Sequence, residues 1–115
     1  MKIPTLLQKL PFIGQAEGER LTYYVLEGNR AYLVVSPNSR GGLNMNVVDQ
    51  ETPEVISRRF GGQRVTGGTL TEKGRRPDLF SDHFSPLNAL YTMVALGRAK
   101  KLKRRLGRSM VFKIK

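Results

Sequence analysis

The clearest pattern of apolar and polar positions lies in the first half of the chain. Residues 21–27 and 30–36 are rich in β-branched and aromatic side chains, a composition that favours strands. They are separated by Gly28-Asn29, and a two-residue turn of this type is typical of a β-hairpin. Residues 43–49 begin by alternating apolar side chains with Asn, which predicts a third strand with one buried face. We therefore expect a three-stranded antiparallel meander. The core positions that this pattern predicts are Val25, Leu33, Val35 and Val47.

The pattern then changes to helical spacing in two places. Thr52-Pro53-Glu54 has a capping hydroxyl, a Pro suited to the first helical position and an acid in the first turn, and Gly61-Gly62 is a natural stop. Ser85-Pro86 starts a second helix, residues 86–96, with apolar side chains at helical spacing and Gly97 after it. Apolar side chains recur at helical spacing at Leu87, Leu90, Tyr91 and Val94, and we expect Leu90, Tyr91 and Val94 to face the core.

The segments around these elements are predicted as turns, loops and a final hairpin. Residues 14–19 are polar and predict a loop, and Gly67-Gly68 predicts a small hairpin within residues 63–72 because adjacent Gly residues are costly in a helix. Residues 98–103 and 109–115 predict two last strands joined by residues 104–108. The sequence thus predicts an α+β fold with a meander, two main helices and a C-terminal β-hairpin, in one domain spanning residues 1–115.

Charge changes the picture at the C-terminal end. The chain has 115 residues and a formal net charge of +11, and residues 98–115 contain nine Lys or Arg and no acid. A segment this basic is stabilised by a polyanion, and nucleic acid is the commonest one inside cells. We therefore expect the chain to bind nucleic acid through its C-terminal hairpin.

Composition excludes several other classes of protein. Without Cys the chain has no disulfide framework, no thiolate nucleophile and no zinc site of the usual kind. No apolar run reaches the roughly 20 residues of a membrane-spanning helix, and the N-terminus lacks the pattern of a signal peptide. We therefore expect no membrane partner, and an intracellular location, cytoplasmic or nucleoid-associated.

The C-terminal quarter resembles the end of a winged-helix DNA-binding domain. The resemblance rests on the helix Ser85-Pro-Leu-Asn-Ala-Leu-Tyr-Thr-Met-Val-Ala-Leu-Gly-Arg, the basic stretch 100–108 and the apolar strand Ser-Met-Val-Phe-Lys-Ile. In that family the helix enters the major groove of DNA and the wing contacts the backbone or the minor groove. The resemblance implies that helix 86–96 presents Asn88 and Thr92, four residues apart, to base edges or phosphates.

Basic residues elsewhere add candidates for phosphate contacts. Arg40 lies in the predicted loop between the second and third strands of the meander, and Arg75 and Arg76 lie in a polar loop before the second helix. The full set of candidate nucleic-acid-binding residues is Arg40, Arg75, Arg76, Asn88, Thr92, Arg98, Lys100, Lys101, Lys103, Arg104, Arg105 and Arg108.

Three alternatives to DNA binding remain open at this point, and one of them is a structural subunit whose sheet edge binds a protein partner. The basic segment also fits ribosomal or other structured RNA, with tyrosines on the meander as a possible base-stacking platform. A metal-dependent nuclease would use His83, or the acids Asp49, Glu51 and Glu54. Residues 82–87 (Asp-His-Phe-Ser-Pro-Leu) resemble the first metal motif of HNH nucleases, but that fold needs further ligands and His83 is the single His of the chain. We therefore expect a binding protein rather than an enzyme, without metal or cofactor.

Overall fold

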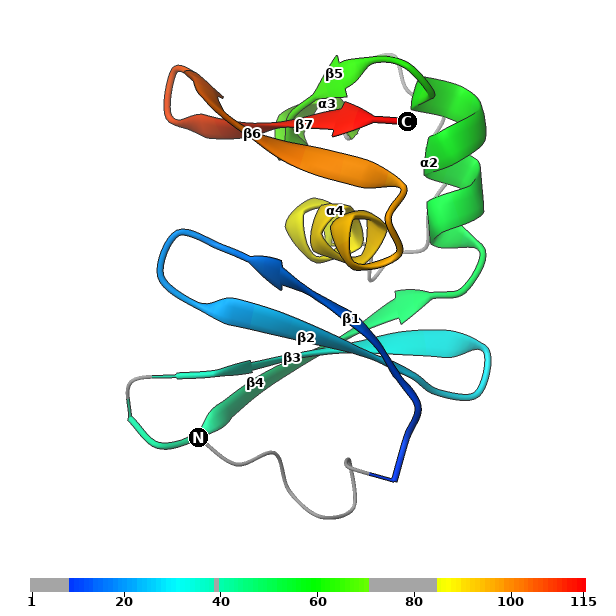
Figure 1. Ribbon diagram of the computed structural model, residues 1–115, viewed down its shortest axis with the longest axis vertical. Coiled ribbons are helices and arrows are strands. Elements are labelled where there is room, and N and C mark those ends of the chain that lie inside the picture. Colours follow the sequence, from blue (N-terminus) through cyan, green and yellow to red (C-terminus); the bar gives the residue numbers. More distant parts are fainter. Residues whose placement is uncertain (1–8, 39, 71–84) are drawn as a thin grey trace.

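The computed structural model describes residues 9–38, 40–70 and 85–115, and it places one helix between two antiparallel sheets (Figure 1). The N-terminal sheet has the order β1-β2-β3-β4, and the C-terminal sheet has the order β5-β7-β6. The strands of the first sheet are β1 (Phe12–Glu17), β2 (Thr22–Glu27), β3 (Ala31–Pro37) and β4 (Leu43–Asp49). The remaining elements are α2 (Thr52–Phe60), β5 (Arg64–Val65), α3 (Gly67–Leu70), α4 (Pro86–Ala95), β6 (Ala99–Leu106) and β7 (Ser109–Ile114).

The α+β class is confirmed, but the three-stranded meander is wrong by one strand. β1 covers part of the segment predicted as a loop and pairs antiparallel with β2, with a register shift between Phe12 and Gly14. Gly14 explains why this strand looks like a loop in the sequence. A Cβ placed on Gly14 would lie 2.5 Å from the carbonyl oxygen of Ala95, so the Gly lets α4 approach the strand closely.

The β2–β3 hairpin is confirmed, although its turn is longer than predicted. β2 ends at Glu27 and β3 begins at Ala31, so Arg30 belongs to the turn. Arg30 has a positive φ of 61°, and the amide of Gly28 donates a hydrogen bond to the carbonyl of Ala31 over 2.8 Å. The left-handed residue of this turn is therefore Arg30 rather than Gly28 or Asn29.

The segment around Gly67-Gly68 is helical, which corrects the predicted small hairpin. Arg64 and Val65 form the short strand β5 beside β7, and α3 begins directly after Thr66. Thr66 and Thr69 cap this start reciprocally: the amide of Thr69 donates to Thr66 Oγ1 over 3.2 Å, and the amide of Thr66 donates to Thr69 Oγ1 over 3.0 Å. These side-chain bonds offset the low helix propensity of the two Gly residues.

Both predicted main helices form close to their expected boundaries. α2 ends before Gly61, as predicted, but its N-cap is Glu51 rather than Thr52. α4 has Ser85 as its N-cap and Pro86 at its start, and Gly97 follows with a φ of 76°. The amide of Gly97 donates to the carbonyl of Val94 over 3.0 Å, which closes the last turn of the helix.

The hydrophobic core lies on both sides of α4. The Tyr91 ring stacks on Tyr23 of β2 with centroids 4.2 Å apart, and it meets Phe112 of β7 edge-on at 5.9 Å. Leu90 and Met93 of the same helix are fully buried. Because both sides of α4 are covered, the helix joins the two sheets into a single core.

The predicted core positions of the meander are partly confirmed. Val25 and Val35 are fully buried and Leu33 is half-buried, but Val47 is 54% exposed. Val47 pairs with Leu33 on the face of the sheet that points away from α4. The neighbouring Val48 is the residue of β4 that joins the core.

Candidate nucleic-acid interface

The last two strands form a basic hairpin that extends beyond the body of the C-terminal sheet (Figure 1). Its buried side chains are Ala99 on β6 and Val111, Phe112 and Ile114 on β7. Its turn consists of Gly107 and Arg108, and the positive φ of 63° at Gly107 suits a two-residue hairpin turn. The turn is therefore shorter than the predicted span of residues 104–108.

An irregularity in β6 gathers cations near the tip of the hairpin. Lys101 pairs with Phe112 and Arg105 pairs with Met110, so three residues of β6 lie opposite the single residue Val111. Two of these three are Lys103 and Arg104, and both side chains are exposed. Bulged strands twist and redirect their side chains, and here the bulged segment carries positive charge.

Two cations of the hairpin bind the N-terminal sheet. The Lys101 ammonium donates a hydrogen bond to the backbone carbonyl of Glu17 over 3.0 Å. Arg105 forms an ion pair with Glu19 in the turn between β1 and β2. These contacts tie β6 to the other sheet at two places, Lys101 near its start and Arg105 two residues before the turn. Lys101 and Arg105 therefore have a structural partner in addition to their predicted role.

Two further cations are held on the side of α2. Arg98 donates to the Glu54 carboxylate over 2.7 Å, and this hydrogen bond and the charge of Arg98 lower the pKa of Glu54. The Lys113 ammonium donates to the carbonyl of Gly62 over 2.6 Å. Arg98 is thus engaged in an ion pair with Glu54, away from the hairpin tip.

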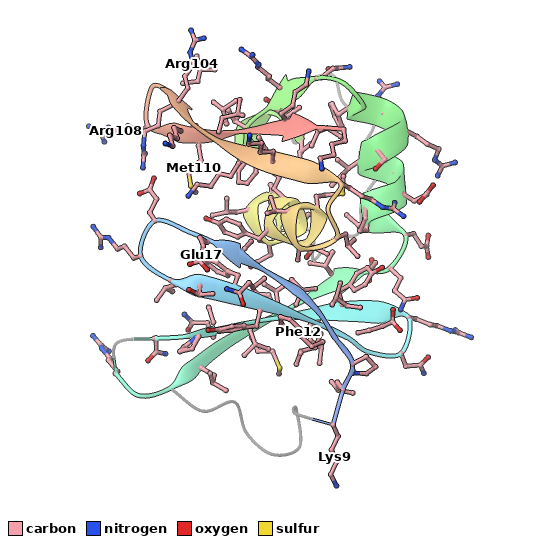
Figure 2. All side chains as sticks on the ribbon, in the orientation of Figure 1. Lys9, Phe12, Glu17, Arg104, Arg108 and Met110 are labelled. Carbon is pink, nitrogen blue, oxygen red and sulfur yellow. The ribbon has the colours of Figure 1, made fainter. Side chains whose placement is uncertain are left out.

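The remaining cations of the hairpin project into solvent. Figure 2 shows Arg104 and Arg108 pointing away from the body of the molecule at the hairpin tip. Within the described residues, no side-chain hydrogen bond or ion pair satisfies Lys100, Lys103, Arg104 or Arg108. We call Lys103, Arg104 and Arg108 the tip cations. They are positioned by the backbone of the hairpin and available to an external anion.

The cationic surface continues from the tip along β6 to a cleft between β6 and β1. The cleft has a volume of about 490 Å³, and its lining includes Lys100, Lys101 and Lys115 together with the acid Glu17. Tyr91 and Val94 of α4 contribute apolar lining. Positive side chains over an apolar floor are compatible with an anionic ligand.

The two candidates on α4 are placed differently from their prediction. Thr92 is completely buried, and its hydroxyl donates to the carbonyl of Asn88 over 2.8 Å. The expectation that Thr92 faces a groove is therefore wrong, because packing around α4 leaves none of its side chain exposed. Asn88 is half-buried, and its Nδ2 donates to Ser85 Oγ over 2.9 Å.

Arg40 is exposed in the loop between β3 and β4. In Figure 1 this loop and the β6–β7 turn lie on the same (left) side of the molecule but at different heights along its longest axis. Asn38 shapes this loop, since its Oδ1 accepts hydrogen bonds from the amides of Arg40 and Gly42, both over 3.0 Å. Arg75, Arg76 and His83 lie outside the described residues.

Sequence reasoning missed the acidic turn next to the hairpin. Glu17 and Glu19 belong to a segment predicted only as a polar loop, and no local pattern links them to residues more than 80 positions later. The one signal in the sequence that could have indicated an acidic partner is the concentration of Lys and Arg in residues 98–115, because so dense a cluster favours a nearby carboxylate.

No family model, curated protein or solved structure matches the chain, so its function is inferred from its own geometry. Among residues 9–38, 40–70 and 85–115, no helix is long and apolar enough to cross a membrane. The same residues contain no group of three or more His, Cys, Asp or Glu side chains that could hold a metal ion.

Proposed function

We propose that this protein binds duplex nucleic acid, DNA in preference to RNA, through contacts between its C-terminal hairpin and the phosphate backbone. The observation that carries the proposal is the position of the tip cations. Lys103, Arg104 and Arg108 are exposed, and Figure 2 shows Arg104 and Arg108 projecting from the hairpin. Binding of a polyanion to cations held in this way is favourable, because each phosphate contact releases condensed counterions.

The order of elements supports a winged-helix-like mode of binding. In the part of the chain that the structure describes, the elements from α2 to β7 are a helix, a strand, two helices and a hairpin, and the strand β5 pairs with β7. The α3 segment supplies a helix where the sequence predicted none. In this mode the β6–β7 hairpin is the wing.

The position of α4 distinguishes this protein from a sequence reader of that family. α4 contacts both sheets, and Thr92 on the predicted recognition face is completely buried. Base contacts specify a sequence, whereas phosphate contacts only position the protein. We therefore propose that α4 is a scaffold and that binding through the wing depends weakly on DNA sequence.

The RNA-binding alternative uses the same cations. Phosphate contacts of the tip cations would serve either duplex, and the choice between them depends on groove shape and on 2′-hydroxyl contacts. Competition between a DNA duplex and a structured RNA of equal charge, at one salt concentration, distinguishes the two. The proposal expects DNA to be the stronger competitor.

The nuclease alternative has no support from the acids it needs. Glu54 is paired with Arg98, and Asp49, Glu51 and Glu54 do not form a group that could hold a metal ion. The role of His83 is tested by comparing cleavage of nucleic acid by the unmodified protein and by His83→Ala in Mg²⁺ and Mn²⁺. Cleavage that is lost in His83→Ala would support the nuclease.

The experiment that tests the proposed interface compares two triple variants of equal charge. Lys103→Gln, Arg104→Gln and Arg108→Gln remove the tip cations. The control replaces Arg30, Arg58 and Arg59, three exposed residues from the β2–β3 turn and α2, with Gln. In Figure 1 both elements lie on the opposite (right) side of the molecule from the β6–β7 turn. Both variants lose three positive charges, so net charge alone affects them equally.

The tip variant should weaken binding to a labelled DNA duplex by at least about tenfold, and the control variant should weaken it much less. Equal weakening by both variants would mean that binding depends on net charge alone. Unchanged binding by the tip variant would refute the hairpin as the interface.

A further inference from the structure

The edges of the two sheets differ in how they are protected against pairing with another chain. β1 has an irregular register, and α4 packs against it at Gly14. β6 is rich in Lys and Arg and has a bulge, and β5 has only two residues. Charged side chains, bulges and short length are the usual devices that keep an edge strand from pairing.

β4 has none of these devices from Leu43 to Val48. It pairs with β3 over seven residues without a register shift, from Leu43 to Asp49, and it contains no Pro, Lys or Arg. Among the described residues, β3 is its one strand neighbour. Asn44, Met45, Asn46 and Val47 are all exposed, with Met45 at 56% and Val47 at 54%.

The sequence of β4 is self-complementary when two copies are placed antiparallel about Met45. Leu43 then lies opposite Val47 of the second copy, Asn44 opposite Asn46, and Met45 opposite Met45. Apolar side chains meet apolar ones on one face, and amides meet amides on the other. The one charged residue of the strand, Asp49, lies beyond these five pairs, so like charges do not oppose each other.

We propose that the β4 edge pairs with β4 of a second copy of this chain, which forms one continuous eight-stranded antiparallel sheet. The pairing satisfies backbone groups along the open edge and covers Met45 and Val47. Such an interface is isologous, with Met45 on the two-fold axis. The C-terminal hairpin belongs to the other sheet, so each copy keeps its hairpin accessible. The inference does not depend on the proposed function.

The test uses the absence of Cys from the chain. Met45→Cys places two thiols on the axis, where Cα atoms of facing residues are about 4.5–5.5 Å apart, within the range of a disulfide. Val47→Cys is the matched control, because Val47 has the same strand, face and degree of exposure. Its two copies would be separated by four residues, roughly 13 Å along the strand.

Under mild oxidation Met45→Cys should form a covalent dimer, and Val47→Cys should form at least about tenfold less. Sedimentation equilibrium of the unmodified protein should show a species of twice 13.0 kDa that increases with concentration. A strict monomer would refute the dimer, whether or not the variants fold. Equal or greater cross-linking of Val47→Cys would refute the pairing about Met45.

Discussion

Tyr91 is a side chain of α4 that contacts both sheets. Its ring stacks on Tyr23 and meets Phe112, and its hydroxyl donates to Met110 Sδ over 3.6 Å. Burial, followed by the charge of Tyr23, raises the pKa of Tyr91 from 10.0 to about 12. Helical spacing in the sequence identified Tyr91 as a core residue, but its ring partners come from strands far away in the chain.

The raised pKa of Tyr91 predicts a loss of stability at alkaline pH. Between about pH 10 and pH 12 the unfolded chain releases this proton while the folded protein retains it, so the free energy of unfolding falls as pH rises. Tyr91→Phe has no proton to release, and its stability should fall by about 1–2 kcal/mol less over that range. Urea unfolding of both proteins at a series of pH values measures the difference. The same dependence of the free energy of unfolding on pH in both proteins would contradict the raised pKa of Tyr91.

Val47 and Thr92 are two positions where the pattern of residues does not predict whether the side chain is buried. β3 and β4 carry apolar side chains on both faces, so alternation cannot indicate whether Val47 or Val48 joins the core. Thr92 is polar by composition, yet its hydroxyl bonds to the Asn88 carbonyl and the rest of the side chain packs as a core residue. In both cases the decision depends on packing against a distant element.

Two valines of the same sheet test this placement. Val35 is fully buried and Val47 is 54% exposed, although the sequence predicted both as core. Val35→Ala should lower the free energy of unfolding by about 1–3 kcal/mol, and Val47→Ala by less than about 0.5 kcal/mol. Chemical denaturation measures both values. A larger loss of stability for Val47→Ala than for Val35→Ala would contradict the placement of Val35 as buried and Val47 as exposed.

At the scale of elements, the segments with strong local signals were predicted and those with weak signals were missed. The β2–β3 hairpin, α2 and α4 have β-branched runs, Pro starts and Gly stops that act within a few residues. β1 was missed because Gly14 interrupts its pattern, and the need for Gly there comes from α4, far away along the chain. α3 was missed because the reciprocal Thr66–Thr69 cap outweighs the Gly residues.

The contact between the hairpin and the β1–β2 turn predicts an effect on binding. Glu19 places a negative charge beside the basic hairpin through its ion pair with Arg105. Glu19→Gln should strengthen duplex binding by roughly threefold, because a repulsive charge is removed and Arg105 becomes available to phosphate. Its effect on folding stability should be small, since exposed ion pairs contribute about 0–1 kcal/mol.

Glu27→Gln is the matched control, since Glu27 is an exposed acid of the same sheet near the β2–β3 turn. It changes net charge equally but lies away from the hairpin. Binding titrations of both variants at low salt give the comparison. Equal gains in affinity would show a general charge effect instead of a local one.

At the scale of the whole molecule, charge is distributed unevenly between the two sheets. The strands of the N-terminal sheet contain no Lys or Arg, whereas β6 and β7 together contain six. The sequence revealed this asymmetry and the position of the hairpin. It could not show that Lys101, Arg105, Arg98 and Lys113 are held within the molecule while the tip cations project from it.

The salt dependence of duplex binding tests the central claim most directly, because its slope reports how many phosphates the protein neutralises. Plots of the logarithm of the binding constant against the logarithm of salt concentration should be linear for the unmodified protein. Replacing Lys103, Arg104 and Arg108 with Gln should reduce the magnitude of the slope by about 0.9 for each phosphate that is no longer neutralised, or roughly 2.7 in all. The Arg30, Arg58 and Arg59 variant should keep the original slope. An unchanged slope for the tip variant would show that the hairpin does not bind phosphate.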